Sequence, residues 1–171
     1  MLGRKRSQKK PSTQGAPDDA YDGLRTMALD AAARGLVSTS PEHPDVAGIV
    51  VDIPAKGGFV TIVGLADGTS SMYTSVGGGI IGAGTHAAVA AATETVLAEV
   101  QRNLGLFKNR DDHELPPEGV VRLHVVTSSA GRRVDVPESA FWGQERHELM
   151  PLTATVQNLI SALSAASPPG A

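Results

Sequence analysis

The dipeptide Asp67-Gly68, placed between two strand-like segments, is the strongest local constraint on the fold of this chain. Residues 59–66 and 69–76 are rich in β-branched and hydroxyl side chains. Asp-Gly suits the positive φ angles of a two-residue type I′ turn. The sequence therefore predicts an antiparallel hairpin whose register sets Val63 opposite Met72.

Six further segments complete the predicted order of elements. In three of them apolar side chains recur at helical spacing, which predicts helices over residues 18–34, 85–104 and 152–163. The other three are rich in β-branched residues or alternate apolar with polar residues, which predicts strands over residues 46–53, 119–127 and 134–141. The order α-βββ-α-ββ-α lacks regular βαβ alternation. It predicts a single α+β domain, a two-layer sandwich in which helices pack on one face of an antiparallel sheet.

Length and composition support one folded domain. A chain of 171 residues with 41% hydrophobic content has room for a single core, which excludes wholesale disorder. The chain has no cysteine, which excludes disulfides, thiolate metal sites, iron–sulfur clusters and cysteine nucleophiles. No apolar run reaches the roughly 18–20 residues of a membrane helix, so no transmembrane segment is predicted.

The charge is unevenly distributed along the chain. The net charge of −3 comes from 15 basic and 18 acidic residues, and five of the basic residues lie in the first ten positions. The rest of the chain has ten basic residues against 18 acidic ones, a net charge of −8. We therefore expect a disordered basic tail over residues 1–17, a folded domain over residues 18–165 and a frayed tail over residues 166–171.

The basic tail admits several partners. It could contact an anionic surface such as lipid or RNA, bind an acidic protein, or fold back over the acidic domain. The polar residues 11–19, which follow the basic residues of the first ten positions, are unlike the apolar stretch of a secretory signal, which favours a cytoplasmic protein. The folded part is acidic and the chain has only six aromatic residues, which argues against specific nucleic-acid binding.

A glycine-rich segment is the best candidate for a ligand site. Residues 77–82 fit the pattern G-x-G-x-x-G between a predicted strand and a predicted helix. A dinucleotide-binding fold also needs a parallel βαβ unit and an acidic residue at the end of its second strand. Glu94 and Glu99, at about the right spacing, fall inside the predicted helix. A Rossmann site is therefore not expected.

Three interpretations of this segment remain, and one of them is that the apolar, glycine-rich loop forms a dimer contact. The N-terminus of a helix can bind an anion through its free backbone N–H groups. If this segment does so, we expect the ligand-binding residues to be Gly77, Gly78, Gly79, Gly82, Gly84, Thr85 and His86. Alternatively, the glycines only let the chain leave a strand and begin a closely packed helix, with Ile80 and Ile81 anchored in the core.

The remaining polar motifs select no catalytic set. Residues 111–114 combine three carboxylates with one imidazole, but consecutive residues cannot all converge on one ion, so a solvated loop is expected and no metal. His124 alternates with apolar strand residues and is expected to be exposed or to cap. No G-x-S-x-G motif is present, and neither a catalytic residue nor a cofactor is predicted.

Phe141 and Trp142 form either an edge of the core or an exposed interface anchor.

Two resemblances follow from these residues. The segment DGTSSMYTS–GGGIIGAGTH (67–86) resembles the core of a family of small bacterial proteins with no assigned activity. The order of elements is similar to that of the small acidic dimeric chaperones of type III secretion, and more loosely to roadblock or profilin-like regulators, which place two strands rather than three before the central helix. These resemblances of shape imply an α+β fold and no particular chemistry.

The sequence thus favours a non-enzymatic module, a protein-interaction or regulatory domain of bacterial type that forms a homodimer or binds another protein. Its acidic body, basic tail, expected sheet edge near Pro137 and aromatic pair support this hypothesis. The alternative is a domain that binds an anionic small molecule or nucleotide, or an enzyme, using the loop from Gly77 to His86.

Overall fold

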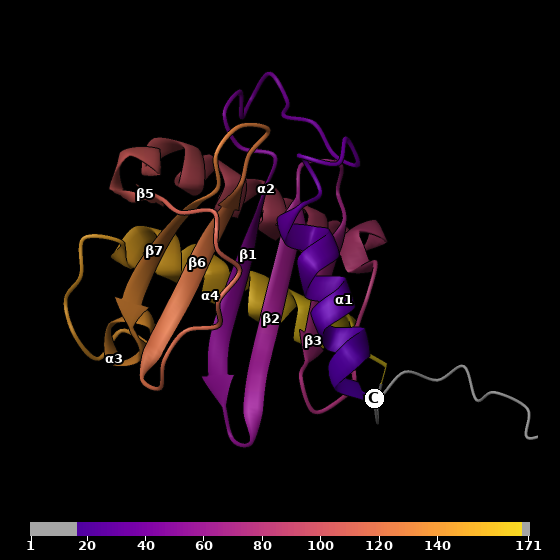
Figure 1. Cartoon of the computed structure of the whole chain (residues 1–171), viewed down its shortest axis with the longest axis vertical. Helices are drawn as coiled ribbons and strands as arrows, with labels where there is room; N and C mark the ends of the chain where they lie inside the picture. Colours follow the sequence, from indigo (N-terminus) through magenta and orange to yellow (C-terminus); the bar gives the residue numbers. More distant parts are fainter. Residues whose placement is uncertain (1–16, 169–171) are drawn as a thin grey trace, which may run out of the picture.

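The fold is built on one antiparallel sheet, as the computed structural model of residues 17–168 shows. Its seven strands lie in the order β4-β3-β2-β1-β6-β7-β5 (Figure 1). The strands are β1 (Gly48–Ala55), β2 (Gly58–Leu65), β3 (Ser70–Thr74), β4 (Gly79–Ile80), β5 (Lys108–Asn109), β6 (Val120–Val126) and β7 (Arg132–Pro137). Central β1 pairs with both β2 and β6 and so joins the two predicted groups of strands.

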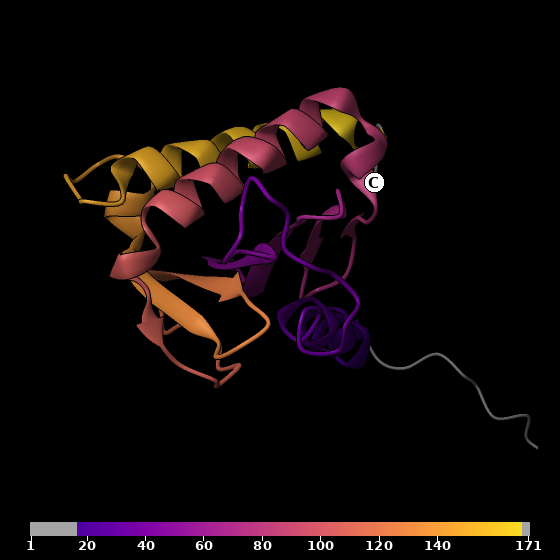
Figure 2. The ribbon, with the colours of Figure 1, turned by 90° about the horizontal axis from the view of Figure 1, so that it is seen from above.

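Helices cover both faces of the sheet. The long helices α2 (Ala87–Arg102) and α4 (Met150–Ala166) lie side by side on one face, and α1 (Pro17–Leu29) packs on the opposite face (Figure 2). The α+β class, the antiparallel sheet and the single domain are confirmed. Helix α1 adds a third layer that the expected two-layer arrangement did not include. Among the helices of the described residues, none has both the length and the apolar character needed to cross a bilayer.

Two apolar clusters explain this three-layer arrangement. The larger fills the space between the sheet and α2 and α4, and includes Ile49, Leu123 and Leu159. The smaller lies beneath α1 and includes Val50 and Val63. Strand β1 contributes to both clusters, and its first six residues are all buried. A strand covered on both faces is expected to be apolar throughout, as β1 is except at Asp52.

The hairpin between β2 and β3 is confirmed, but its predicted turn and register are wrong. The backbone N–H of Leu65 donates to the carbonyl of Thr69 at 2.8 Å, so three residues form the turn instead of two. The carboxylate of Asp67 accepts from the N–H of Thr69 at 2.8 Å, and Gly68 takes a φ of 89°. The aspartate side chain thus stabilises a longer turn than the dipeptide alone suggests.

The longer turn shifts the pairing by one residue. Met72 lies opposite Ile62 instead of Val63, and Ser71 takes the place opposite Val63. Because side chains alternate between the faces of a strand, the shift moves Tyr73 to the face beneath α1 and Met72 toward α2 and α4. The side chains of β3 that meet α1 are therefore not those that the sequence assigns to that face.

Several element boundaries also differ from the prediction. The glycine-rich segment forms the short strand β4 and a 3₁₀ turn at Ala83–Thr85 before α2 begins at Ala87. The predicted strand 134–141 is divided into β7 and the short helix α3 (Glu138–Phe141). The Pro137 end of β7 has no outer neighbour among the described residues, because β5 pairs only with Arg132 and Arg133. Residues 1–16 and 169–171, which include all but one residue of the predicted N-terminal tail and half of the predicted C-terminal tail, lie outside the described residues.

Candidate functional site

The structure does not gather the seven predicted ligand residues in one place. Gly77, Gly78 and Gly79 form the turn into β4, with φ angles of 97°, 90° and 141°, and line a pocket beside α1. The three glycines therefore face the side of the sheet that α1 covers, whereas the helix they were expected to precede lies on the other side.

The other four residues of that hypothesis have separate roles. The N–H of Gly82 donates to Ser71 Oγ at 3.2 Å. Gly84 is packed so closely on the turn between β2 and β3 that a Cβ there would lie 1.6 Å from the carbonyl oxygen of Gly68. Thr85 and His86 are exposed just before α2, and neither lines a pocket with Gly77–Gly79. The close approach of Gly84 supports the packing interpretation at that position.

The predicted aromatic pair is divided between core and surface. Phe141 is fully buried, whereas Trp142 keeps 44% of its surface exposed. The rings meet edge to face with centroids 4.8 Å apart, a favourable aromatic geometry. Phe141 is thus a core residue, and an interface anchor at this position is a prediction that concerns Trp142 alone.

A long apolar groove runs beside α1, and we call it the α1 groove. One part is a cavity of about 230 Å³ between the helix and strands β2 and β3. Its walls are almost entirely apolar, with Asp67 the one charged residue among those that line it: Leu24, Met27, Ala28, Ala31, Leu36, Val63, Leu65, Asp67, Thr69, Ser71, Tyr73 and Ile81.

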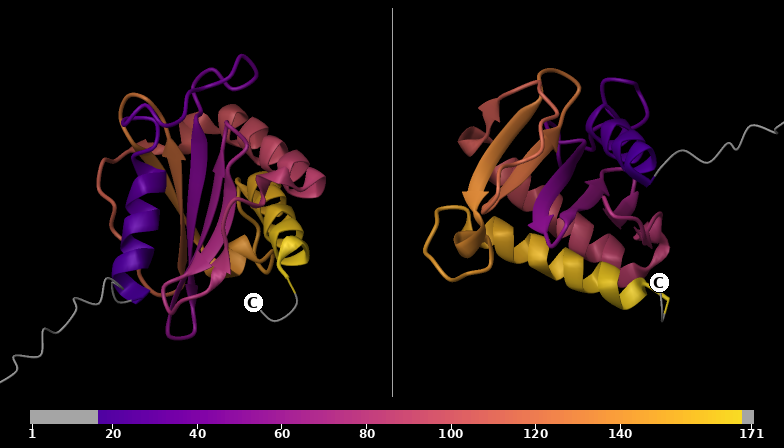
Figure 3. Two further views of the ribbon diagram at one scale, coloured as in Figure 1. Left: turned by 90° about the vertical axis from the view of Figure 1, so that its right-hand side faces the viewer. Right: turned by 60° about the horizontal axis from the view of Figure 1, so that its bottom comes forward.

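The α1 groove continues toward the start of the helix. A second cavity of about 290 Å³ shares Leu24, Tyr73 and Ile81 with the first. It extends to Ala20 on α1 and to the triple glycine, so the predicted glycine loop forms one end of the groove. The residues of α1 that line the two cavities run from Ala20 to Ala28, along most of the helix. Figure 3 shows α1 on the face of the sheet opposite α2 and α4.

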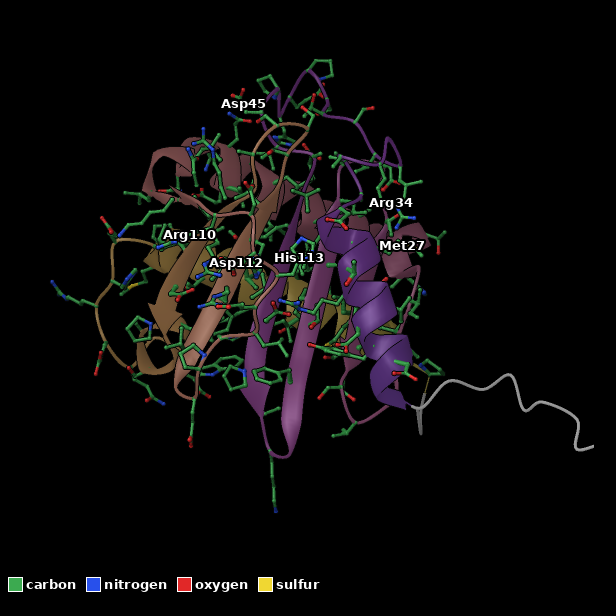
Figure 4. All side chains as sticks on the ribbon, viewed as in Figure 1. Met27, Arg34, Asp45, Arg110, Asp112 and His113 are labelled. Atoms are coloured by element: carbon green, nitrogen blue, oxygen red, sulfur yellow. The ribbon has the colours of Figure 1, made fainter. Side chains whose placement is uncertain are left out.

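Large apolar side chains project around the α1 groove. Met27, Leu36 and Ile81 line it with exposed fractions of 49%, 56% and 61%, and Val76 follows the adjacent β3 with 64%. They account for four of the seven large apolar side chains that are exposed in the described part of the chain, so exposed apolar surface is concentrated here. Contiguous apolar patches of this kind mark interaction sites on soluble domains. Met27 is visible on α1 in Figure 4.

The sequence predicted neither the groove along α1 nor the exposure of the side chains around it. Ile80 and Ile81 were both expected in the core, but Ile80 is only half-buried and Ile81 is exposed. The helical spacing within residues 18–34 predicts an apolar stripe of Tyr21, Leu24, Met27, Ala28 and Ala31. Tyr21 and Ala28 of this stripe are buried, as that pattern predicts. The stripe shows which side of α1 faces the sheet, but Met27 on that stripe stays 49% exposed at the wall of the groove.

A buried ionic network fastens α1 to the sheet. Arg25 of α1 donates to Asp52 of β1 through Nε (3.0 Å to Oδ1) and Nη2 (2.7 Å to Oδ2). Thr61 donates to Asp52 Oδ1 at 2.8 Å and can therefore accept from the hydroxyl of Tyr21, which lies 2.7 Å away. The Asp52 side chain is fully buried and that of Arg25 is 6% exposed. Such a bidentate geometry positions the helix closely.

His124 lies against this network, contrary to the expectation of an exposed residue. It is 4% exposed, and its Nε2 lies 3.4 Å from Asp52 Oδ2 without hydrogen-bond geometry. Burial lowers the pKa of His124 below its usual value, although the nearby carboxylate opposes this. Burial by itself would raise the pKa of Asp52, but the approach of His124 and the hydrogen bonds of Arg25 lower it below its usual value.

The segment of residues 110–116, which we call the strap, covers His124 and the neighbouring strands. Arg25 Nη1 donates to the carbonyl of His113 at 2.5 Å, and Arg122 Nη1 donates to that of Glu114 at 2.9 Å. Asp112 pairs with Arg133. The predicted solvated acidic loop is therefore tied down by backbone carbonyls and by an ion pair. Among residues 17–168, no group of three His, Asp or Glu side chains could hold a metal ion.

Comparison of the chain with family models, with curated proteins and with solved structures found no match. The resemblance to a family of small bacterial proteins, and the similarity to secretion chaperones or roadblock-like regulators, therefore stay predictions.

Proposed function

We propose that this protein is a non-enzymatic interaction module that forms a homodimer through the α1 groove. The proposal rests on one observation, the contiguity of two apolar cavities with three projecting apolar side chains, those of Met27, Leu36 and Ile81. Because Asp67 is the single charged residue that lines this cavity, the desolvation cost of covering it is small.

The shape of the surface favours a second copy of the chain as the occupant. A two-fold interface uses the same patch on both subunits, so the patch must supply both hollow and projecting parts. The groove provides the hollow, and Ile81 and Met27 on its opposite walls provide the projections. Ile81 of one subunit would enter the groove of the other beside Leu24 and Tyr73, and the reciprocal contact would be identical.

The rigidity of the groove supports the same conclusion. One wall is α1, which the buried pair of Arg25 and Asp52 fixes on the sheet. The floor is formed by paired strands β2 and β3. A preformed surface loses little conformational entropy on association. A cytoplasmic location fits such a module and stays a prediction.

The oligomeric state tests the proposal directly. Sedimentation velocity of the full chain over a range of micromolar concentrations is expected to give a dimer, and Ile81→Glu and Met27→Glu are expected to give monomers. A buried carboxylate would be desolvated at the centre of the interface. Met150→Glu is the matched control, because Met150 is also a helical methionine, is 39% exposed and lies outside the groove.

Circular dichroism and thermal unfolding of each variant would establish that the fold is retained, which the exposure of Ile81 and Met27 leads us to expect. A wild-type chain that sediments as a monomer at every concentration would overturn self-association. A dimer that persists equally in Ile81→Glu, Met27→Glu and Met150→Glu would place the interface elsewhere and overturn the role of the groove.

A further inference from the structure

Positive charge accumulates at the outer corner of the sheet, beyond β7. The pairing of β5 with β7 sets Lys108 directly opposite Arg133, on the same face as His124. Like charges directly opposite each other destabilise a strand pair. Asp112 pairs with Arg133, but no carboxylate of the described residues lies within ion-pair distance of Lys108.

Arg110 adds a further cation at the start of the strap. Its backbone N–H donates to the carbonyl of Gly131 at 2.8 Å, which holds the segment against β7. Its side chain is exposed and, within residues 17–168, has no acidic partner. Figure 4 shows Arg110, Asp112 and His113 in succession along the strap in front of the sheet.

A hollow of about 260 Å³ lies among these cations. It is lined by Lys108, Arg110, Arg133, Val134 and Asp135. The carboxylate of Asp135 is held by Arg122, with Nε 2.7 Å from Oδ1 and Nη2 2.9 Å from Oδ2, so a cation already neutralises it. Arg133 is likewise paired with Asp112. The unpaired charges that line this hollow are therefore those of Lys108 and Arg110, and both are positive.

The concentration of cations is unusual for this chain. From residue 17 onward the sequence has ten Lys and Arg residues against 18 Asp and Glu, and three of the ten, Lys108, Arg110 and Arg133, line this hollow. Of the nearby carboxylates, Asp112 and Asp135 are paired with Arg133 and Arg122, and Asp111 accepts from the backbone N–H of Gly131. A positive corner on an acidic domain attracts anions toward one place, because the local potential there opposes that of the surrounding surface.

We infer that this hollow binds a small soluble molecule bearing a phosphate group. The guanidinium of Arg110 can donate two parallel hydrogen bonds to phosphate oxygens, and Lys108 supplies a compact charge from the adjacent position. A hollow of about 260 Å³ suits one phosphate with a few further atoms.

A residue-resolved titration tests this inference, because five cations in the first ten residues would bind phosphate without specificity. Inorganic phosphate and pyrophosphate would be added to the ¹⁵N-labelled full chain at constant ionic strength, with sodium chloride as the reference. Saturable amide shifts are expected at Lys108, Arg110 and Arg133, and pyrophosphate should bind more tightly than phosphate because it carries more charge.

Variants separate a site from general attraction. Lys108→Ala and Arg110→Ala should each weaken pyrophosphate binding about fivefold, because each removes one exposed charge contact. Lys56→Ala is the matched control, since Lys56 is exposed in the turn between β1 and β2, away from this hollow. Amide shifts confined to the first sixteen residues would overturn the inference. So would pyrophosphate affinities that are equal in the three variants, or amide shifts that sodium chloride reproduces.

Discussion

Arg25 and Asp52 form a buried two-pronged ion pair between the helix and the centre of the sheet, with Nε 3.0 Å from Oδ1 and Nη2 2.7 Å from Oδ2. The remaining terminal nitrogen of Arg25 donates to the carbonyl of His113. One guanidinium therefore joins three parts of the chain, α1, β1 and the strap. The α1 groove and the strap thus depend on the same side chain.

Removal of the carboxylate should strongly destabilise the fold. Asp52→Ala leaves the guanidinium of Arg25 buried without its counter-charge, and the expected loss is about 3–5 kcal/mol in the free energy of unfolding. Urea denaturation at neutral pH would measure it. Arg102→Ala is the matched control. It removes an ion pair with Glu99 in which Arg102 is 66% exposed, so a change below about 1 kcal/mol is expected.

The paired variant distinguishes an unpaired charge from lost packing. Arg25→Met combined with Asp52→Ala removes both charges, so the double variant should be more stable than Asp52→Ala alone. A double variant that loses the sum of the two single effects would contradict the role assigned to this ion pair.

Acidification should destabilise the protein in two steps of the same sign. The pKa of His124 is lowered by burial, so below the usual value of 6.5 the unfolded chain takes up a proton that the folded chain does not. Stability therefore falls as the pH drops below about 6.5, by at most about 1.4 kcal/mol per pH unit for this one group. The lowered pKa of Asp52 adds a second loss below its usual value of 3.8.

The variant His124→Gln isolates the first step. Unfolding free energies at pH 7.5 and 5.5 should differ less in this variant than in the wild type, because glutamine does not titrate. His86→Gln, at an exposed position, is the control with the wild-type slope. A wild-type slope in His124→Gln would mean that other groups cause the acid sensitivity.

The order and type of the elements could be predicted because each depends on local periodicity and turn residues. The α-βββ-α-ββ-α order survives, with short elements added at β4, β5 and α3. The register of β2 and β3 could not be predicted, because the side chain of Asp67 stabilises a turn one residue longer than its dipeptide suggests. One residue is enough to exchange the faces of Tyr73 and Met72.

The buried polar network could not be predicted from the sequence either, for a different reason. Arg122 and His124 alternate with apolar residues, which normally indicates a solvent-exposed face. They are buried because the strap docks over them, and it docks through carbonyl contacts to Arg25, 88 residues away from His113 in sequence. No local pattern predicts a contact of that range.

The glycines should differ sharply in their tolerance of a side chain. A Cβ at Gly84 would lie 1.6 Å from the carbonyl oxygen of Gly68, and one at Gly79 would lie 2.3 Å from that of Met72. Gly84→Ala and Gly79→Ala should therefore each destabilise by at least about 2 kcal/mol. A Cβ at Gly82 would meet no atom within 4 Å, so Gly82→Ala is strained only by the φ of 71°. We therefore expect it to lower the free energy of unfolding by about 1 kcal/mol.

Thermal unfolding of the three variants would measure these differences. The stability of each variant must be known before ligand binding at the glycine-rich segment is tested. A loss of binding in Gly79→Ala would reflect the backbone clash as much as a lost ligand contact. Equal stability of Gly79→Ala and Gly82→Ala would contradict the close pairing of β3 with β4.

Truncation of the neighbours Phe141 and Trp142 should destabilise the fold to very different extents. Phe141→Ala empties a fully buried site in the cluster beneath α4 and should cost about 3–5 kcal/mol of unfolding free energy. Trp142→Ala removes a ring that is 44% exposed and loses mainly its edge-to-face contact, so about 1 kcal/mol is expected. Urea denaturation separates the two. Sedimentation of the folded Trp142→Ala variant then decides whether the exposed ring has an interface role, because a dimer that dissociates on this substitution would place the interface at α3 instead of the α1 groove.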